Sequence, residues 1–179
     1  MKTRALLLLL LCALLFTFSC KKKEANPKEV LPAATMEGKN TFGAMVNGKV
    51  WLPKGRPSFF QSNYKIIYDP GYRGGTLNIV AYRQIEGDPV DFEQMVMGMT
   101  QVDHEGVYIF DNAELSGVRY YNGICEYDDA PDFYQQGKLE LTKLDLVNGI
   151  IAGKFELTLA ITGCDTIRIT EGRFDKKIF

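Results

Sequence analysis

The dipeptide Asn-Gly occurs three times and constrains the fold class more than any other feature of this sequence. The pairs are Asn47-Gly48, Asn122-Gly123 and Asn148-Gly149. Both residue types accept a positive φ, which the favoured two-residue turn of an antiparallel β-hairpin requires at both positions. Short apolar segments flank every pair, so the sequence predicts three hairpins. The segments expected to pair are 42–46 with 49–52, 118–121 with 124–127, and 139–147 with 150–161.

Further segments have the length and period-two alternation of β-strands, and no long amphipathic helix is visible. Three methionines, Met95, Met97 and Met99, share one face of such a segment, which indicates core filling rather than a metal-binding stripe. The pattern predicts an all-β fold, an antiparallel β-sandwich or open barrel built from hairpins, as a single domain after a flexible tether. The additional strands are expected at 64–68, 76–83, 94–102, 107–110 and 166–170.

In the last hairpin, the apolar residues of the first strand do not keep to one face, whereas those of the second strand do. Its second strand keeps Phe155, Leu157 and Leu159 on one face, whereas on its first strand Leu141 and Leu144 have opposite parity. A β-bulge near 142–143 would return both leucines to the core face. We expect the bulge to place Leu141 opposite Phe155 and Leu139 opposite Leu157.

The chain begins with a segment typical of an export signal. Lys2 and Arg4 precede residues 5–18, which are apolar except for Thr17. That length suits the apolar region of a signal peptide and is short for a membrane span. The closing Thr17-Phe18-Ser19-Cys20 resembles the lipobox of bacterial lipoproteins, which implies cleavage before Cys20 and acylation of that cysteine. Cleavage without lipid and an uncleaved anchor are the alternatives.

The expected domain boundaries follow from this signal. Residues 1–19 are a lipoprotein signal peptide, residues 20–41 are the lipidated Cys20 with a flexible tether, and residues 42–179 are the all-β domain. The tether contains Pro27 and Pro32, and its residues 24–41 include no aromatic. The expected location is the outer membrane, with the domain tethered by lipid. The lysines at 21–23 favour the periplasmic face over the cell surface, because exported surface lipoproteins often carry acidic residues there.

Charge and cysteine content exclude several classes of function. Removal of the signal leaves 19 basic and 22 acidic residues, so no basic excess indicates a nucleic-acid partner. Cys125 and Cys164 remain in an exported chain and are expected to form a disulfide; two separate buried thiols are the alternative. His104 is the single histidine, so a Cys/His metal cluster is not expected, and neither a metal nor another cofactor is predicted.

Both ends of the mature chain resemble one family. The segments are 38–43 (GKNTFG), 46–51 (VNGKVW) and 164–175 (CDTIRITEGRFD). They resemble a group of uncharacterised Bacteroidetes lipoproteins with a domain of unknown function, while residues 54–137 are poorly matched. The resemblance implies a lipid-anchored β domain and does not indicate any particular activity.

The candidate catalytic groups are better explained as loops. Residues 103–106 (DHEG) are read as a polar hairpin loop rather than an acid–base or metal site. The acidic loop with Glu126, Asp128, Asp129 and Asp132 lacks the spacing of a calcium loop and is read as a solvated turn. No nucleophile motif surrounds any serine, so no catalytic residue is predicted and the chain is not expected to be an enzyme.

The function expected from sequence is therefore a non-catalytic interaction or structural module of the cell envelope. The first alternative is a lipoprotein that binds a glycan or a small apolar ligand through aromatic loops, and the least favoured is a hydrolase. The expected partners are the membrane, through the lipid anchor, and an envelope protein or glycan. The candidate ligand-binding residues are Phe59, Phe60, Tyr64, Tyr72, Tyr121 and Tyr134. Core packing is the competing explanation of these aromatics.

Overall fold

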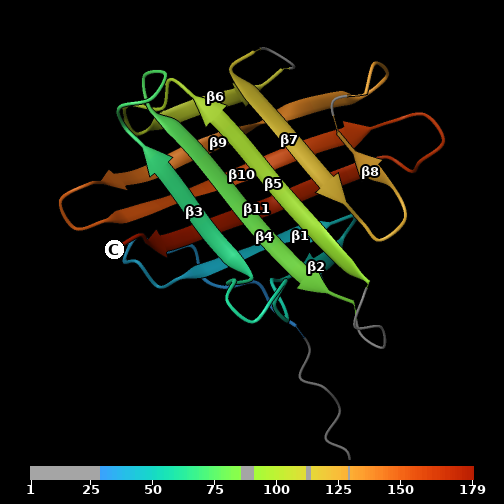
Figure 1. The fold of residues 1–179 in the computed structure, drawn as a ribbon, viewed down its shortest axis with the longest axis horizontal. Helices are drawn as coiled ribbons and strands as arrows, with labels where there is room; N and C mark the ends of the chain where they lie inside the picture. Colours follow the sequence, from blue (N-terminus) through green and yellow to red (C-terminus); the bar gives the residue numbers. More distant parts are fainter. Residues whose placement is uncertain (1–28, 86–90, 112–113, 129) are drawn as a thin grey trace, which may run out of the picture.

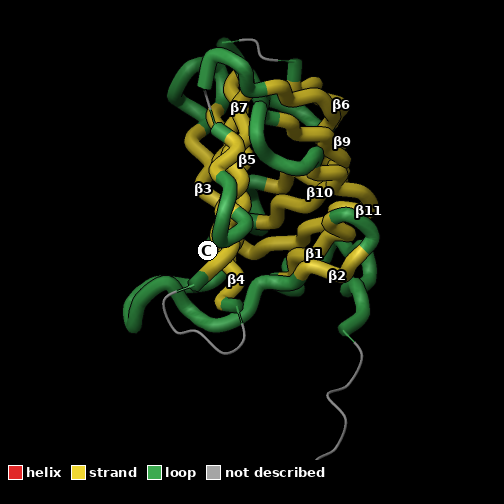
Figure 2. Tube along the Cα trace, turned by 90° about the vertical axis from the view of Figure 1, so that its right-hand side faces the viewer, coloured by secondary structure: helices red, strands yellow, loops and turns green. Residues whose placement is uncertain are grey.

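Two antiparallel β-sheets pack face to face and form a sandwich (Figures 1 and 2). The computed structural model describes residues 29–85, 91–111, 114–128 and 130–179. Its described residues contain strands and loops only, which confirms the all-β prediction. Sheet A has the order β2 (Lys49–Trp51), β1 (Thr41–Val46), β11 (Ile167–Lys177), β10 (Ile150–Ala160), β9 (Tyr134–Asp145) and β6 (Gly106–Phe110). Sheet B has the order β3 (Tyr64–Asp69), β4 (Thr76–Gln84), β5 (Phe92–Thr100), β7 (Ser116–Tyr121) and β8 (Glu126–Tyr127).

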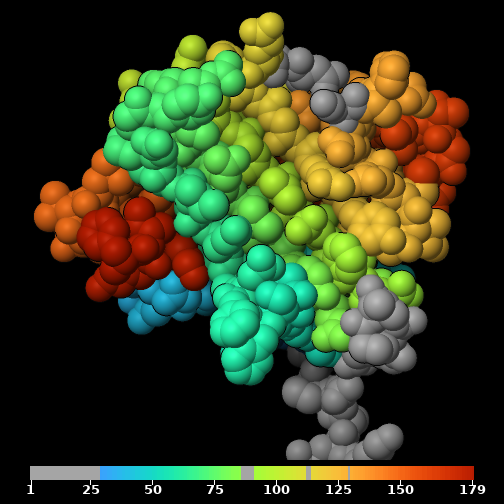
Figure 3. Space-filling view, in the orientation of Figure 1, coloured from blue at the N-terminus to red at the C-terminus, as the bar shows by residue number. Residues whose placement is uncertain are grey.

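Alternate residues of the strands fill the space between the sheets. The three methionines of β5 are at most 4% exposed and belong to one hydrophobic cluster with buried residues of both sheets, so their expected core role is confirmed. Burial of one such side chain contributes roughly 1.5–3 kcal/mol, and the core is continuous across both sheets. The loop 53–63, between β2 and β3, projects from the lower end of the molecule in Figure 3.

The three hairpins form as expected, but two of their turns are longer than two residues. Val46 pairs with Lys49, and Asn47 and Gly48 both have positive φ, as the short turn requires. The second hairpin pairs Tyr121 with Glu126, and the third pairs Asp145 with Ile150. In these two cases the Oδ1 atom of an Asn or Asp side chain folds the loop by accepting backbone N–H groups: Asn122 from Ile124 and Cys125, Asp145 from Val147 and Asn148.

The predicted bulge is present on β9. Lys143 pairs with Ala152 and Leu141 pairs with Gly153, so Thr142 is the additional residue. The predicted partners were wrong by two positions, because Leu139, not Leu141, lies opposite Phe155. The difference arises because the turn that follows Asp145 has four residues instead of two, which moves every pairing by two residues. A shift of two residues keeps each side chain on the same face of the sheet. Leu146 becomes part of the turn and is 42% exposed.

Residues 29–40, named here the N-terminal strap, cross the outer face of sheet A before β1. Its Pro32 packs where Gly43 has no side chain: a Cβ added at Gly43 would stand 2.8 Å from Pro32 Cδ. Further along, the buried carboxylate of Asp175 accepts four hydrogen bonds from the strap. The donors are Thr35 Oγ1 at 2.6 Å and the backbone N–H groups of Gly38 at 2.7 Å, Glu37 at 3.0 Å and Lys39 at 3.1 Å.

The tether boundary drawn from the sequence at residue 41 leaves the strap outside the domain, whereas the structure ties it to β11. The strap has no aromatic residue and no alternation of apolar and polar residues, so its own sequence does not predict that it packs on the sheet. Four of its hydrogen bonds are made to one carboxylate, which is 136 to 140 residues away along the chain. The earlier part of the predicted tether and the signal peptide lie outside the described residues.

A disulfide between Cys125 and Cys164 joins the two sheets, as expected from the sequence. Cys125 lies in the loop between β7 and β8 of sheet B, and Cys164 lies in the loop between β10 and β11 of sheet A. Closure of this loop contributes roughly 4 kcal/mol in the chain-entropy model. Beside it, Tyr127 donates a hydrogen bond from its hydroxyl to the carbonyl of Asp165 at 2.5 Å, which adds a second link between the sheets.

The Asp175 carboxylate is expected to stabilise the fold above about pH 4. Burial alone would raise the pKa of Asp175, but the hydrogen bonds from Thr35 and from three strap N–H groups lower it below its ordinary value. A depressed pKa gives stability that is complete above the unfolded-state value of about 3.9 and is lost as pH falls further, through the folded-state value. Asp175→Asn should therefore lower the free energy of unfolding by about 2–4 kcal/mol at pH 7.

Chemical denaturation at pH 7 and pH 3 measures this effect. Asp69→Asn is the matched control, because that exposed carboxylate accepts one local hydrogen bond, from Gly71 N–H at 2.9 Å, and should change stability by less than about 0.5 kcal/mol. An equal effect of both substitutions at pH 7 would contradict the role of Asp175.

Candidate functional site

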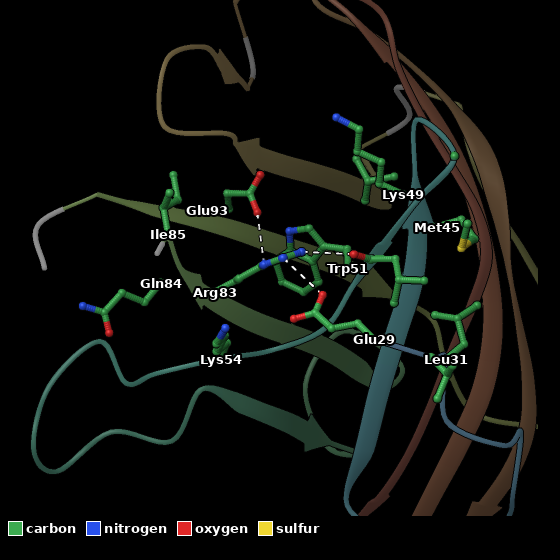
Figure 4. Close-up of a pocket in the computed structure, with 14 residues that line it drawn as sticks. Glu29, Leu31, Met45, Lys49, Trp51, Lys54, Arg83, Gln84, Ile85 and Glu93 are labelled. Carbon is green, nitrogen blue, oxygen red and sulfur yellow. Dashed lines mark hydrogen bonds and ion pairs between the residues drawn. The ribbon is translucent and has the colours of Figure 1, made fainter. Parts of the chain in front are cut away.

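A large cleft opens at one end of the sandwich, where β2 of sheet A faces the ends of β4 and β5 (Figure 4). It has a volume of about 1280 Å³. Strap residues 29–31 form one wall, and β1, β2 and the last residues of β4 form the others. Apolar side chains dominate these walls, namely Val30, Leu31, Met45, Val46, Val50 and Ile85. Charged groups gather at its inner end, around Arg83.

Arg83 is the centre of this cleft and makes three polar contacts. Its Nη1 donates to the carbonyl of Val50 at 3.1 Å, and its Nη2 donates to Glu29 Oε2 at 3.3 Å. Its Nε lies 3.8 Å from Glu93 Oε2. The guanidinium thereby connects the strap, sheet A and sheet B, and Figure 4 shows all three contacts as dashed lines.

The strand pattern places Arg83 and Glu93 at this position. Residues of β4 and β5 that point inward include Ala81 and Met95, and Arg83 and Glu93 are the next inward positions towards the open end. They lie opposite each other in the β4–β5 ladder. A charged pair is tolerated here because the sandwich opens to solvent, and the side chains keep 24% and 21% exposure.

The Glu93 carboxylate is partly desolvated by its surroundings. Burial raises the pKa of Glu93 above its ordinary value, although Arg83, Trp51 and Tyr120 each act to lower it. The Tyr120 hydroxyl donates to Glu93 Oε1 at 3.4 Å, while the buried indole N–H of Trp51 faces the same carboxylate without completing a hydrogen bond. Burial and the Glu93 charge together raise the pKa of Tyr120.

The cleft is suited to holding a ligand, and its charged residues also fix the strap and the two sheets to one another at its inner end. The charges of Arg83 and Glu93 are directed at each other and at the strap, so they fix the inner end of the cleft. The apolar walls remain open towards solvent, with Gln84 and two lysines, Lys49 and Lys54, at their borders. A ligand with an apolar body and a few polar groups fits such walls.

The sequence did not single out these residues, although a signal for them exists. Charged residues at the inward parity of otherwise apolar strands, here Arg83 after Ala81 and Glu93 before Met95, indicate a strand end or a buried pair. The single tryptophan, Trp51, is 2% exposed beside them. The contribution of Glu29 has no such signal, because it depends on the path of the strap.

The six aromatic residues predicted from sequence as a ligand site do not assemble into one surface. Only Phe59 and Phe60 lie together, with ring centroids 5.1 Å apart. Tyr64 is 4% exposed and packs against Phe42 in the core. Tyr72 lies in the loop between β3 and β4, and Tyr121 packs against Phe92. Tyr134, at the start of β9, is 46% exposed, and its hydroxyl donates to Gln136.

The polar loops are exposed to solvent, as expected, but residues 103–106 do not close a hairpin, because they join β5 of sheet B to β6 of sheet A. His104 Nδ1 lies 2.5 Å from Asp103 Oδ1 in the exposed loop after β5. Glu126 pairs with Arg119, and Asp132 accepts the N–H of Thr162, while Asp129 lies outside the described residues. Across the described ranges, no three His, Cys, Asp or Glu side chains are close enough to hold a metal ion.

The comparisons with known proteins are negative in each case. No family model, no curated protein and no solved structure matches this chain. Within the described part of the chain, no helix is long and apolar enough to cross a membrane.

Removal of the Arg83 guanidinium should destabilise the fold in a pH-dependent way. Arg83→Met leaves the carboxylate of Glu93 desolvated without its cation and the carbonyl of Val50 without its donor. A loss of about 1–3 kcal/mol is expected at pH 7. Because the remaining carboxylate has a raised pKa, the loss should shrink as pH falls and Glu93 becomes protonated.

Denaturation curves at pH 7 and pH 5 of the single variants and of the double variant form the test. The double variant Arg83→Met/Glu93→Gln should recover part of the loss, since no uncompensated charge remains. A double variant that loses as much as the sum of the two single variants would show that the pair is not coupled.

Proposed function

We propose that this chain is a lipid-anchored protein of the outer membrane whose β-sandwich is a non-catalytic interaction module. The apolar segment 5–18 followed by Cys20 supports the anchor, and the resemblance to Bacteroidetes lipoproteins agrees with it. Two or three acyl chains on one cysteine give stable attachment, whereas a single chain is marginal.

The strap is the observation that carries this proposal. It is tied to sheet A by Asp175 and to sheet B by the contact between Glu29 and Arg83. Only residues 20–28 separate an acylated Cys20 from the folded unit, and nine extended residues span at most about 30 Å. A module held so close to its membrane acts on partners at the membrane surface, such as an envelope protein or glycan.

The anchor is tested by Cys20→Ala. The unchanged chain should incorporate labelled palmitate and sediment with membranes, because its cysteine is acylated, while the variant should appear in the soluble fraction without label. Cys12→Ala is the matched control and should behave as the unchanged chain does. Incorporation of palmitate into Cys20→Ala would refute the assignment.

A second candidate function is the binding of a small apolar ligand in the cleft around Arg83. The apolar walls and the volume of about 1280 Å³ favour it. Native mass spectrometry of protein purified from its own envelope would detect such a ligand as added mass. Substitution of Val50→Glu in the wall should remove that mass, whereas Ile67→Glu, on the outer face of sheet B at 50% exposure, should retain it.

A further inference from the structure

Two adjacent phenylalanines form the tip of the loop 53–63. Phe59 is 82% exposed and Phe60 is 92% exposed, and their rings contact each other edge to face. The N–H of Gln61 donates to the carbonyl of Ser58 at 3.3 Å, so the two phenylalanines occupy the centre of a tight turn. Large apolar side chains gathered in water at a turn are uncommon in a soluble domain and indicate a surface that contacts something apolar.

The base of this loop is fixed, so the tip is held away from the sandwich. Tyr82 of β4 binds both ends of the loop: its N–H donates to the carbonyl of Asn63 at 2.7 Å, and its carbonyl accepts the N–H of Lys54 at 3.1 Å. The N–H of Gln84 also donates to the carbonyl of Lys54, at 2.9 Å. The loop is therefore a projection with a defined position on the domain.

The projection and the strap leave the sandwich at the same end. A groove of about 420 Å³ is lined by Val30 and Leu31 of the strap and by Pro53 and Asn63 from the two ends of the loop. Both views of the backbone show the loop and the start of the described chain at the lower end of the molecule (Figures 1 and 2). An anchor within nine residues of Glu29 would keep this end within about 30 Å of the lipid.

The charge of the loop suits a lipid surface. Residues 53–63 include Lys54 and Arg56 and no acidic residue. Basic side chains next to an aromatic tip are attracted to anionic headgroups while the rings enter the boundary between headgroups and acyl chains. Each phenylalanine buried in this way strengthens the attachment roughly 10- to 100-fold.

We propose that Phe59 and Phe60 insert into the membrane surface beside the lipid anchor and orient the domain with its 53–63 end towards the lipid. This inference rests on the proposed anchor at Cys20. The cleft around Arg83, which includes Lys54 and Glu29 in its walls, then opens close to the headgroups.

An environment-sensitive label on the acylated full chain tests the orientation. The fluorophore NBD is attached to Phe60→Cys and, as the matched control, to Tyr72→Cys, an aromatic that is 59% exposed at the other end of β3. The unsubstituted chain, treated in the same way, reports any background labelling. The proteins are reconstituted into vesicles of phosphatidylethanolamine and phosphatidylglycerol and are isolated by flotation.

The label at position 60 should show a blue-shifted, brighter emission that a quencher attached to the acyl chains extinguishes, while the label at position 72 should remain water-like. Protein that floats with the vesicles but shows water-like emission at position 60, or equal burial at both positions, overturns the orientation and leaves the anchor intact. Protein that does not float overturns the anchor and the orientation that depends on it.

Discussion

The carboxylate of Asp175 is the interaction on which the arrangement of the N-terminal part depends. Four donors converge on it, three of them backbone N–H groups that would otherwise lose their partners when the strap covers sheet A. Burial raises the pKa of Asp175 and the hydrogen bonds lower it, and the hydrogen bonds have the larger combined effect, since the pKa lies below its ordinary value. The same strap places Glu29 beside Arg83, where it forms part of the wall of the cleft.

Much of the fold followed from local chemistry in the sequence. The Asn-Gly pairs located the hairpins, the parity of Leu141 and Leu144 located the bulge at Thr142, and the two remaining cysteines gave the disulfide. The sequence did not predict the length of two turns. Asn122 and Asp145 accept backbone N–H groups with their side-chain oxygens, which favours a four-residue loop over the two-residue turn. The strap was also missed, since its contacts are made with residues at the other end of the chain.

Sequence reasoning left two explanations open for the aromatic residues, ligand binding and core packing. Tyr64 belongs to the core, while Phe59 and Phe60 are exposed to solvent. Sequence reasoning also passed over the charged pair at the open end of the sandwich, because a single Arg or Glu in an alternating segment has the appearance of a surface residue until strand pairing is known. The cleft around Arg83 and the loop that carries Phe59 and Phe60 both lie at the end of the domain where the strap begins.

The place of β1 in sheet A has a consequence for how the protein acquires its structure. β1 lies between β2 and β11, so the first long strand of the domain is paired with the last one, and Thr41 stands opposite Asp175. A ribosome delivers β1 early, yet its partner emerges only when the chain is nearly complete. Sheet A therefore closes as a late event, and contacts of such long sequence separation make folding slow. Until then β1 has an unpaired edge, which can pair with other chains and aggregate unless a chaperone protects it.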